Sequence, residues 1–157
     1  MCSSDLTGGD AYAGSILIDA ITSPTGSSSL IQLGAVNAYS AGLGGDGGVG
    51  LTDLDGGIGG AGGDGTGGQI LMLGDAGNGN LVVNGAAQAY SLGLGGAGGL
   101  GGDGIDGVGG VGGVGGIGNG GNIQIGTRSG AASTVNTGSA TFNGDLQMFS
   151  YGFGGAG

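Results

Sequence analysis

Short runs of apolar and polar residues recur three times along the chain. The first run of each repeat covers residues 15–21, 69–73 and 122–126, the second 29–33, 80–84 and 139–143, and the third 35–40, 86–91 and 145–150. Apolar and β-branched residues dominate these runs, and Gly, Asn, Ser or Pro separate them, which is typical of strands that end in turns. No stretch shows a 3.6-residue apolar period, and glycine interrupts every window of helical length. The pattern predicts an all-β chain without helices.

A recurring motif marks the repeat. YSAGLGG (39–45), YSLGLGG (90–96) and FSYGFGG (149–155) begin 51 and 59 residues apart, which indicates a solenoid or array. We therefore expect three strand units to stack as a parallel β-solenoid, with equivalent residues in register. This stacking predicts a structural aromatic ladder of Tyr39, Tyr90 and Phe149, and an amide ladder of Asn37, Gln88 and Gln147 on the same face. A ligand platform is the weaker interpretation of the aromatic residues.

Glycine tracts at 42–68, 93–121 and 152–157 separate the units. Within the second tract glycine recurs at every third position: Gly95, Gly98, Gly101, Gly104, Gly107, Gly110, Gly113 and Gly116. In a polyproline-II (polyglycine-II) helix of three residues per turn, such a column carries no side chains and can pack against another backbone. Breaks at 51–55 and 103–106 predict that each tract folds into two antiparallel legs. The alternative is a flexible glycine-rich linker.

The returning leg of the second tract carries a second regular column. Counted at three residues per turn, its members are Ile105, Val108, Val111, Val114 and Ile117. A linker needs no such column, so this pattern favours ordered legs with an apolar face.

The sequence indicates a single repetitive domain over residues 7–157, with strand units at about 15–41, 69–92 and 122–151. Residues 1–6, MCSSDL, resemble the translated tail of a sequencing adapter, and we expect them to be a cloning or assembly scar. The chain stops inside a glycine tract, so we also expect it to be a fragment of a longer protein.

Composition narrows the class of protein further. Of 157 residues 50 are Gly, but the single Pro excludes a collagen triple helix. The net charge of −10, with one Lys or Arg in total, makes nucleic acid an improbable partner. One Cys allows no disulfide framework within the chain, and no apolar run is long enough for a membrane span. The partners that we expect are neighbouring repeats of the same chain, and possible extracellular or cell-surface ligands.

One nonapeptide suggests a cofactor. Residues 101–109, GGDGIDGVG, match the calcium-binding repeat pattern GGxGxDxUx, with Asp103 and Asp106 as candidate ligands. A looser match at 59–67 adds Asp64. In the next nonapeptide, however, Val114 stands where Asp should recur. We therefore expect a chain without cofactors, and calcium binding is the alternative.

The sequence offers no catalytic residues. Without His, Glu or Lys, most triads, zinc sites and acid–base pairs cannot form. The pair Asp53 and Asp55 fits turn chemistry better than catalysis. The GxGxxG match at 93–98 opens no helix and predicts no nucleotide site. We expect a non-enzymatic protein.

Short strands separated by tracts such as GGAGGDGTGG (59–68) and GGAGGLGGDG (95–104) resemble the large adhesin-like β-strand-repeat proteins that bacteria secrete. The resemblance implies a structural or adhesive segment of a larger protein located outside the cell or on its surface. The tracts are also similar to the glycine-rich repeats of mycobacterial surface proteins. A further similarity, to the polyproline-II bundles of small arthropod antifreeze proteins, implies ice binding as an alternative function.

Overall fold

The computed structural model describes residues 7–21, 28–52, 55–75, 78–128 and 138–157. Every regular element in these ranges is a β-strand, as predicted, and none is a helix. Three consecutive units contribute four strands each. Unit 1 contains β1 (Ala11–Tyr12), β2 (Ile16–Ala20), β3 (Ser29–Leu33) and β4 (Val36–Leu43). Unit 2 contains β5 (Gly65–Thr66), β6 (Ile70–Asp75), β7 (Gly79–Val83) and β8 (Ala87–Leu94). Unit 3 contains β9 (Gly118–Asn119), β10 (Ile123–Arg128), β11 (Ser139–Phe142) and β12 (Leu146–Phe153).

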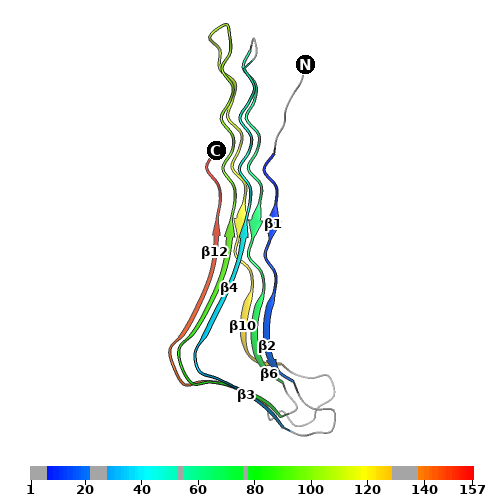
Figure 1. Cartoon of the computed structure of the whole chain (residues 1–157), viewed down its shortest axis with the longest axis vertical. Helices are drawn as coiled ribbons and strands as arrows, with labels where there is room; N and C mark the ends of the chain where they lie inside the picture. The colour runs from blue at the N-terminus through cyan, green and yellow to red at the C-terminus, as the bar shows by residue number, and fades with distance from the viewer. Residues whose placement is uncertain (1–6, 22–27, 53–54, 76–77, 129–137) are drawn as a thin grey trace.

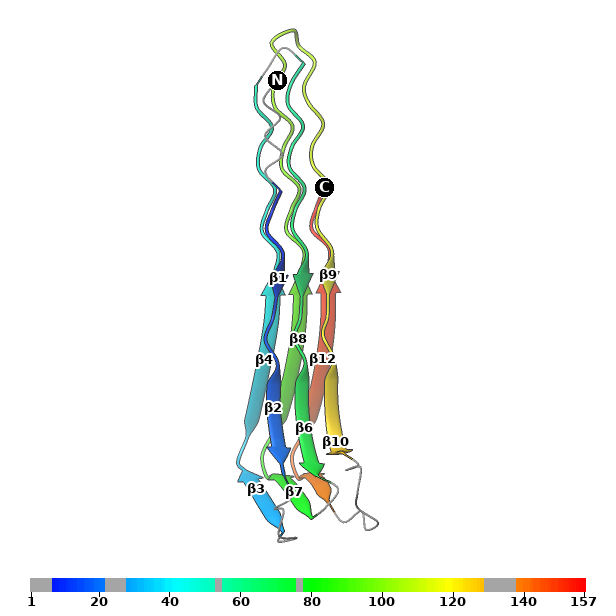
Figure 2. The same cartoon turned by 90° about the vertical axis from the view of Figure 1, so that its right-hand side faces the viewer.

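Equivalent strands of the three units pair side by side in parallel sheets (Figure 2). The sheet orders are β1-β5-β9, β10-β6-β2, β11-β7-β3 and β12-β8-β4, so unit 2 always lies in the middle. Tyr39 pairs with Tyr90, and Tyr90 with Phe149. The register that the repeated motif predicted is therefore confirmed.

A small apolar core lies where three sheets meet (Figure 1). The sheet of β2, β6 and β10 faces the sheet of β4, β8 and β12, and the sheet of β3, β7 and β11 closes the lower end. Side chains of unit 2 fill the centre, among them Ile70, Met72, Leu81 and Val83, which are fully buried. Alternation along β4 and β8 sends alanines inward and the aromatic and amide side chains outward.

The third long strand of each unit extends beyond the predicted run, to Leu43, Leu94 and Phe153. The extension enters the glycine tract, where inward positions must be occupied by glycine. A Cβ at Gly42 would overlap the carbonyl oxygens of Thr66 and Ala11 on the facing backbone. The strand therefore continues with its alternation intact, and only the depth of the interior decreases.

Beyond the three sheets that enclose the core, the chain forms long legs that project from the end opposite β3, β7 and β11 and include the short strands β1, β5 and β9 (Figure 1). We call 44–52, 95–104 and 154–157 the outgoing legs, and 8–14, 56–68 and 109–121 the returning legs. Antiparallel bonds join the two layers, as in Gly60 N–H to Gly48 O (2.7 Å), and parallel bonds join legs within a layer, as in Gly62 N–H to Val114 O (2.9 Å). Gly56 and Gly107, near the two tips, have φ of 69° and 86°, which the reversal requires and glycine tolerates.

Candidate functional site

The glycine legs pack backbone against backbone, and two glycine columns produce this contact. On the middle outgoing leg, a Cβ at Gly95, Gly98 or Gly101 would overlap the carbonyl oxygen of Gly116, Gly113 or Gly110. On the returning leg, a Cβ at Gly110, Gly113 or Gly116 would overlap that of Gly57, Gly60 or Gly63. The predicted column therefore packs against one neighbour on the way out and another on the way back.

The column changes role at the hairpin tip. A Cβ at Gly104 would overlap the Val108 carbonyl, whereas one at Gly107 would meet no atom within 4 Å. Gly107 is needed for its positive φ and not for close packing.

A second glycine column went unrecognised in the sequence. A Cβ at Gly96, Gly99 or Gly102 would overlap the carbonyl of Gly45, Gly48 or Leu51 on the first outgoing leg. Glycine doublets are its signal, because a leg with neighbours on two sides needs two of its three columns free of side chains. The third column of this leg faces outward and contains Leu100, which is 74% exposed. On the returning side of the same hairpin the outward column leaves five side chains each at least 60% exposed: Ile105, Val108, Val111, Val114 and Ile117.

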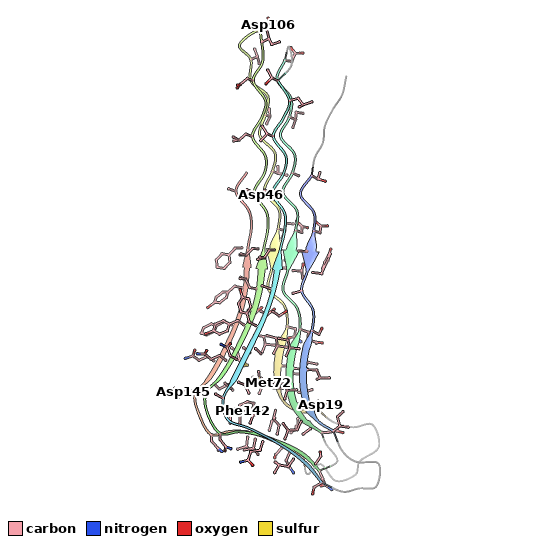
Figure 3. The ribbon with its side chains drawn as sticks, in the orientation of Figure 1. Asp19, Asp46, Met72, Asp106, Phe142 and Asp145 are labelled. Atoms are coloured by element: carbon pink, nitrogen blue, oxygen red, sulfur yellow. The ribbon has the colours of Figure 1, made fainter. Side chains whose placement is uncertain are left out.

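The three candidate calcium ligands do not lie together. Asp106 is at the tip of the second hairpin (Figure 3), with Asp103 close to it in sequence. Asp64 is on the returning leg of the first hairpin, at the level of Gly96, whose N–H donates to Gly63 O (2.9 Å). Asp103 lies on the outgoing leg that contains Gly96, seven residues after it. At ~3.1 Å per residue, Asp103 is therefore on the order of 20 Å from Asp64.

Asp64 instead has a structural contact. Its Oδ1 accepts a hydrogen bond from the Ile117 N–H (2.7 Å) on the next returning leg. Asp10 accepts in the same way from Asp64 N–H, and Asp46 from Ala97 N–H, each at 2.8 Å. These N–H groups point outward, where no backbone carbonyl accepts from them. The aspartate on the adjacent leg is the acceptor instead.

A row of serines, Ser40, Ser91 and Ser150, marks the junction between apolar core and glycine legs. Ser91 Oγ donates to Gly68 O (2.7 Å) and accepts from Gly121 N–H (2.9 Å), so it joins two returning legs. Ser40 likewise donates to Gly14 O and accepts from Gly68 N–H. Ser91 is fully buried, so its bond to Gly68 O satisfies a hydroxyl and a carbonyl that water cannot reach. In the sequence, this row is indicated by the serine that follows the aromatic residue in every copy of the repeated motif.

The outer face of the β12-β8-β4 sheet carries the aromatic side chains. The rings of Tyr90 and Phe149 are stacked, with centroids 5.2 Å apart, and the parallel arrangement continues along β12 to Tyr151 and Phe153. Tyr39 occupies the equivalent register position in unit 1. Beside them Gln88 Nε2 donates to Gln147 Oε1 (3.1 Å), which forms part of the predicted amide ladder.

The chemistry available to these groups is limited. Among the described residues, no three His, Cys, Asp or Glu side chains gather closely enough to hold a metal ion. Asp55 lies near the tip of the first hairpin, and its partner Asp53 is outside the described ranges. Within those ranges no helix is long and apolar enough to cross a membrane.

The fold and contacts define the chain as an all-β protein of parallel three-stranded sheets extended by paired glycine-rich legs. No protein-family model, curated protein or solved structure matches it.

Proposed function

We propose that the chain is a non-enzymatic structural and adhesive segment of a larger secreted or cell-surface repeat protein of the adhesin-like class. In this proposal its three units are successive turns of a parallel β-solenoid, and its legs are polyglycine-II hairpins. The observation that carries the proposal is the leg bundle, in which hydrogen bonds run both within and between the two layers.

In such a bundle, a small number of glycine-rich residues forms an extended and stiff element. A polyproline-II leg has no internal hydrogen bonds, so alone it is flexible and fully solvated. Backbone bonds to neighbours on two sides restrict each leg, and glycine lets the backbones approach closely. A rigid projection that presents regular rows of side chains suits a spacer or contact surface outside the cell. The net charge of −10 keeps such a surface solvated.

Two experiments test this function. Small-angle scattering of the purified chain is expected to give an elongated rigid particle, whereas a compact head with a disordered tail would contradict the proposed stiffness. Sequencing the coding region on both sides is expected to reveal further strand units with an export or anchoring segment. A continuous catalytic domain there would overturn the assignment.

Ice binding is the second candidate, and the exposed column from Val108 to Ile117 favours it. Its exposed side chains recur every three residues, about 9 Å apart along a straight leg. An ice-recrystallisation assay separates the candidates. The spacer function predicts no inhibition, whereas inhibition that is lost in Val111→Asp/Val114→Asp would establish the ice-binding function.

A further inference from the structure

Two tyrosines lie side by side on the outer face of the β12-β8-β4 sheet. Tyr39 of β4 and Tyr90 of β8 are register partners in parallel strands, so their backbones lie one strand spacing apart, about 4.8 Å. Alternation sends both side chains outward, and Tyr39 is 59% exposed. The sheet therefore presents two neighbouring phenol groups to the solvent, where an oxidant can reach them.

The neighbours of this pair hold one ring and leave the other room to move. The Tyr90 ring is stacked on Phe149, with centroids 5.2 Å apart and an interplanar angle of 16°. On the same face beside Tyr39, unit 1 carries the small Ala41, where unit 2 carries the larger Leu92. Because exposed side chains change rotamer within nanoseconds, the Tyr39 ring can turn toward the Tyr90 ring, which the stacking holds in place.

The other two tyrosines of the chain have no such partner. The Tyr151 ring lies between those of Phe149 and Phe153, with centroids 5.7 and 6.0 Å away. Phe149 also stacks on Tyr90, so its ring separates the two tyrosines. Tyr12 belongs to the returning layer, in the separate sheet of β1, β5 and β9. Phenylalanine has no phenolic O–H to lose, so the row of rings contains a single pair of adjacent phenols.

We propose that Tyr39 and Tyr90 are a site of oxidative coupling, at which hydrogen peroxide and a peroxidase join two consecutive units by a dityrosine bond. The peroxidase removes one electron and one proton from each phenol, and the peroxide takes up both electrons and both protons to become two water molecules. The two tyrosyl radicals combine through the ring carbons ortho to their oxygens, and the hydrogens on those carbons move to the oxygens. The chain loses two hydrogen atoms in all.

The reaction is expected to stay within one chain. Groups held on neighbouring strands react at an effective concentration in the millimolar range or above, which exceeds that of a second copy in a micromolar solution. Each copy also carries a net charge of −10, which opposes encounters between copies. The bond closes the chain between positions 39 and 90 into a loop. It restricts the unfolded chain as a disulfide does, so it should stabilise the stack.

Four single variants distinguish the pair from the other tyrosines. Tyr39→Phe and Tyr90→Phe each remove one phenol and keep an aromatic ring on the outer face. Tyr12→Phe and Tyr151→Phe are the matched controls, because these tyrosines are 76% and 43% exposed but lie outside the pair. A triple variant, Tyr39→Phe/Phe149→Tyr/Tyr151→Phe, moves the pair of phenols to positions 90 and 149, where the ring centroids are 5.2 Å apart.

Treatment of the full chain with a haem peroxidase and hydrogen peroxide, at micromolar protein concentration, tests the proposal. Mass spectrometry of the monomer is expected to show the loss of two hydrogen atoms, with dityrosine fluorescence, in the unaltered chain and in both controls. The cross-link is expected to be absent from Tyr39→Phe and Tyr90→Phe, and to return in the triple variant. The cross-linked unaltered chain should have a Tm on the order of 10 °C higher.

Four results would overturn the proposal. They are an unaltered monomer that keeps its mass, coupling that yields only cross-linked dimers, a cross-link that survives in Tyr39→Phe, and a triple variant that does not recover the cross-link.

Discussion

A methyl group added at two adjacent glycines of the same leg should change stability in opposite directions. At Gly113 the new Cβ would overlap the carbonyl of Gly60, and the Gly113 N–H donates to Gly99 O (2.7 Å). At Gly112 the nearest atom would be Gly99 O at 3.4 Å, an ordinary contact. Gly112→Ala is therefore the matched control for Gly113→Ala.

The expected magnitudes follow from these contacts. Either change restricts the unfolded chain equally, which stabilises the protein by about 0.4–1 kcal/mol where the native backbone accepts alanine. Gly112→Ala should show that gain. At Gly113 overpacking costs about 1–3 kcal/mol, and a strained or broken hydrogen bond costs about 1 kcal/mol more. The two variants should thus differ by about 2–4 kcal/mol.

Thermal unfolding followed by circular dichroism measures the difference. For a chain of this length about 2–4 °C accompanies each kcal/mol, so the two Tm values should differ by about 4–16 °C. Leucine substitutions extend the comparison. Gly110→Leu should lower the Tm far more than Val111→Leu, because the Val111 side chain is 73% exposed. Equal Tm values within each pair would mean that the tract is a linker without a packed glycine face.

Three further predictions concern polar groups. Ser91→Ala should lower the free energy of unfolding by about 2–4 kcal/mol, because the Gly68 carbonyl and the Gly121 N–H lose their partner. Ser29→Ala, which removes an exposed hydrogen bond to Ile21 O, should change the free energy of unfolding by less than about 0.5 kcal/mol in urea titrations. Asp64→Ala should lower the free energy of unfolding by about 1–2 kcal/mol. Asp64→Asn should lower it much less, because the amide oxygen can still accept from Ile117 N–H. Equal losses in the two variants would show that the charge of Asp64 matters and not its hydrogen bond. Calcium should leave the Tm unchanged, since Asp64 lies far from Asp103 and Asp106; a rise that Asp103→Asn abolishes would contradict this.

The periodic features of the structure could be predicted from the sequence. Alternation in the third run predicted that Asn37 and Tyr39 share a face, and the repeated motif predicted the alignment of Tyr39, Tyr90 and Phe149. Both follow from local rules, because a strand alternates with period two and stacked repeats bring equivalent residues together.

What escaped prediction depends on distances between legs that are remote in sequence. Asp64 matched a calcium motif, yet its Oδ1 bonds to Ile117 N–H on the next leg. Nothing local shows that this N–H lacks a carbonyl partner, so the role of the aspartate emerges only from the packed bundle. The serine row is similar, since the repeated motif contains Ser40 and its equivalents but does not reveal the glycine backbones that Ser40 joins.

Residue-resolved amide hydrogen exchange on the monomer tests the packed bundle most directly. Gly110, Gly113 and Gly116 donate to Gly102 O, Gly99 O and Gly96 O at 2.7–2.8 Å, whereas Gly112 and Gly115 lie on the outer edge of unit 3. We expect slow exchange at the first three amides and fast exchange at the other two, a protection pattern with a period of three residues. Uniformly fast exchange from residue 109 to 117 would contradict the account, because it would show that the leg has no ordered backbone partners.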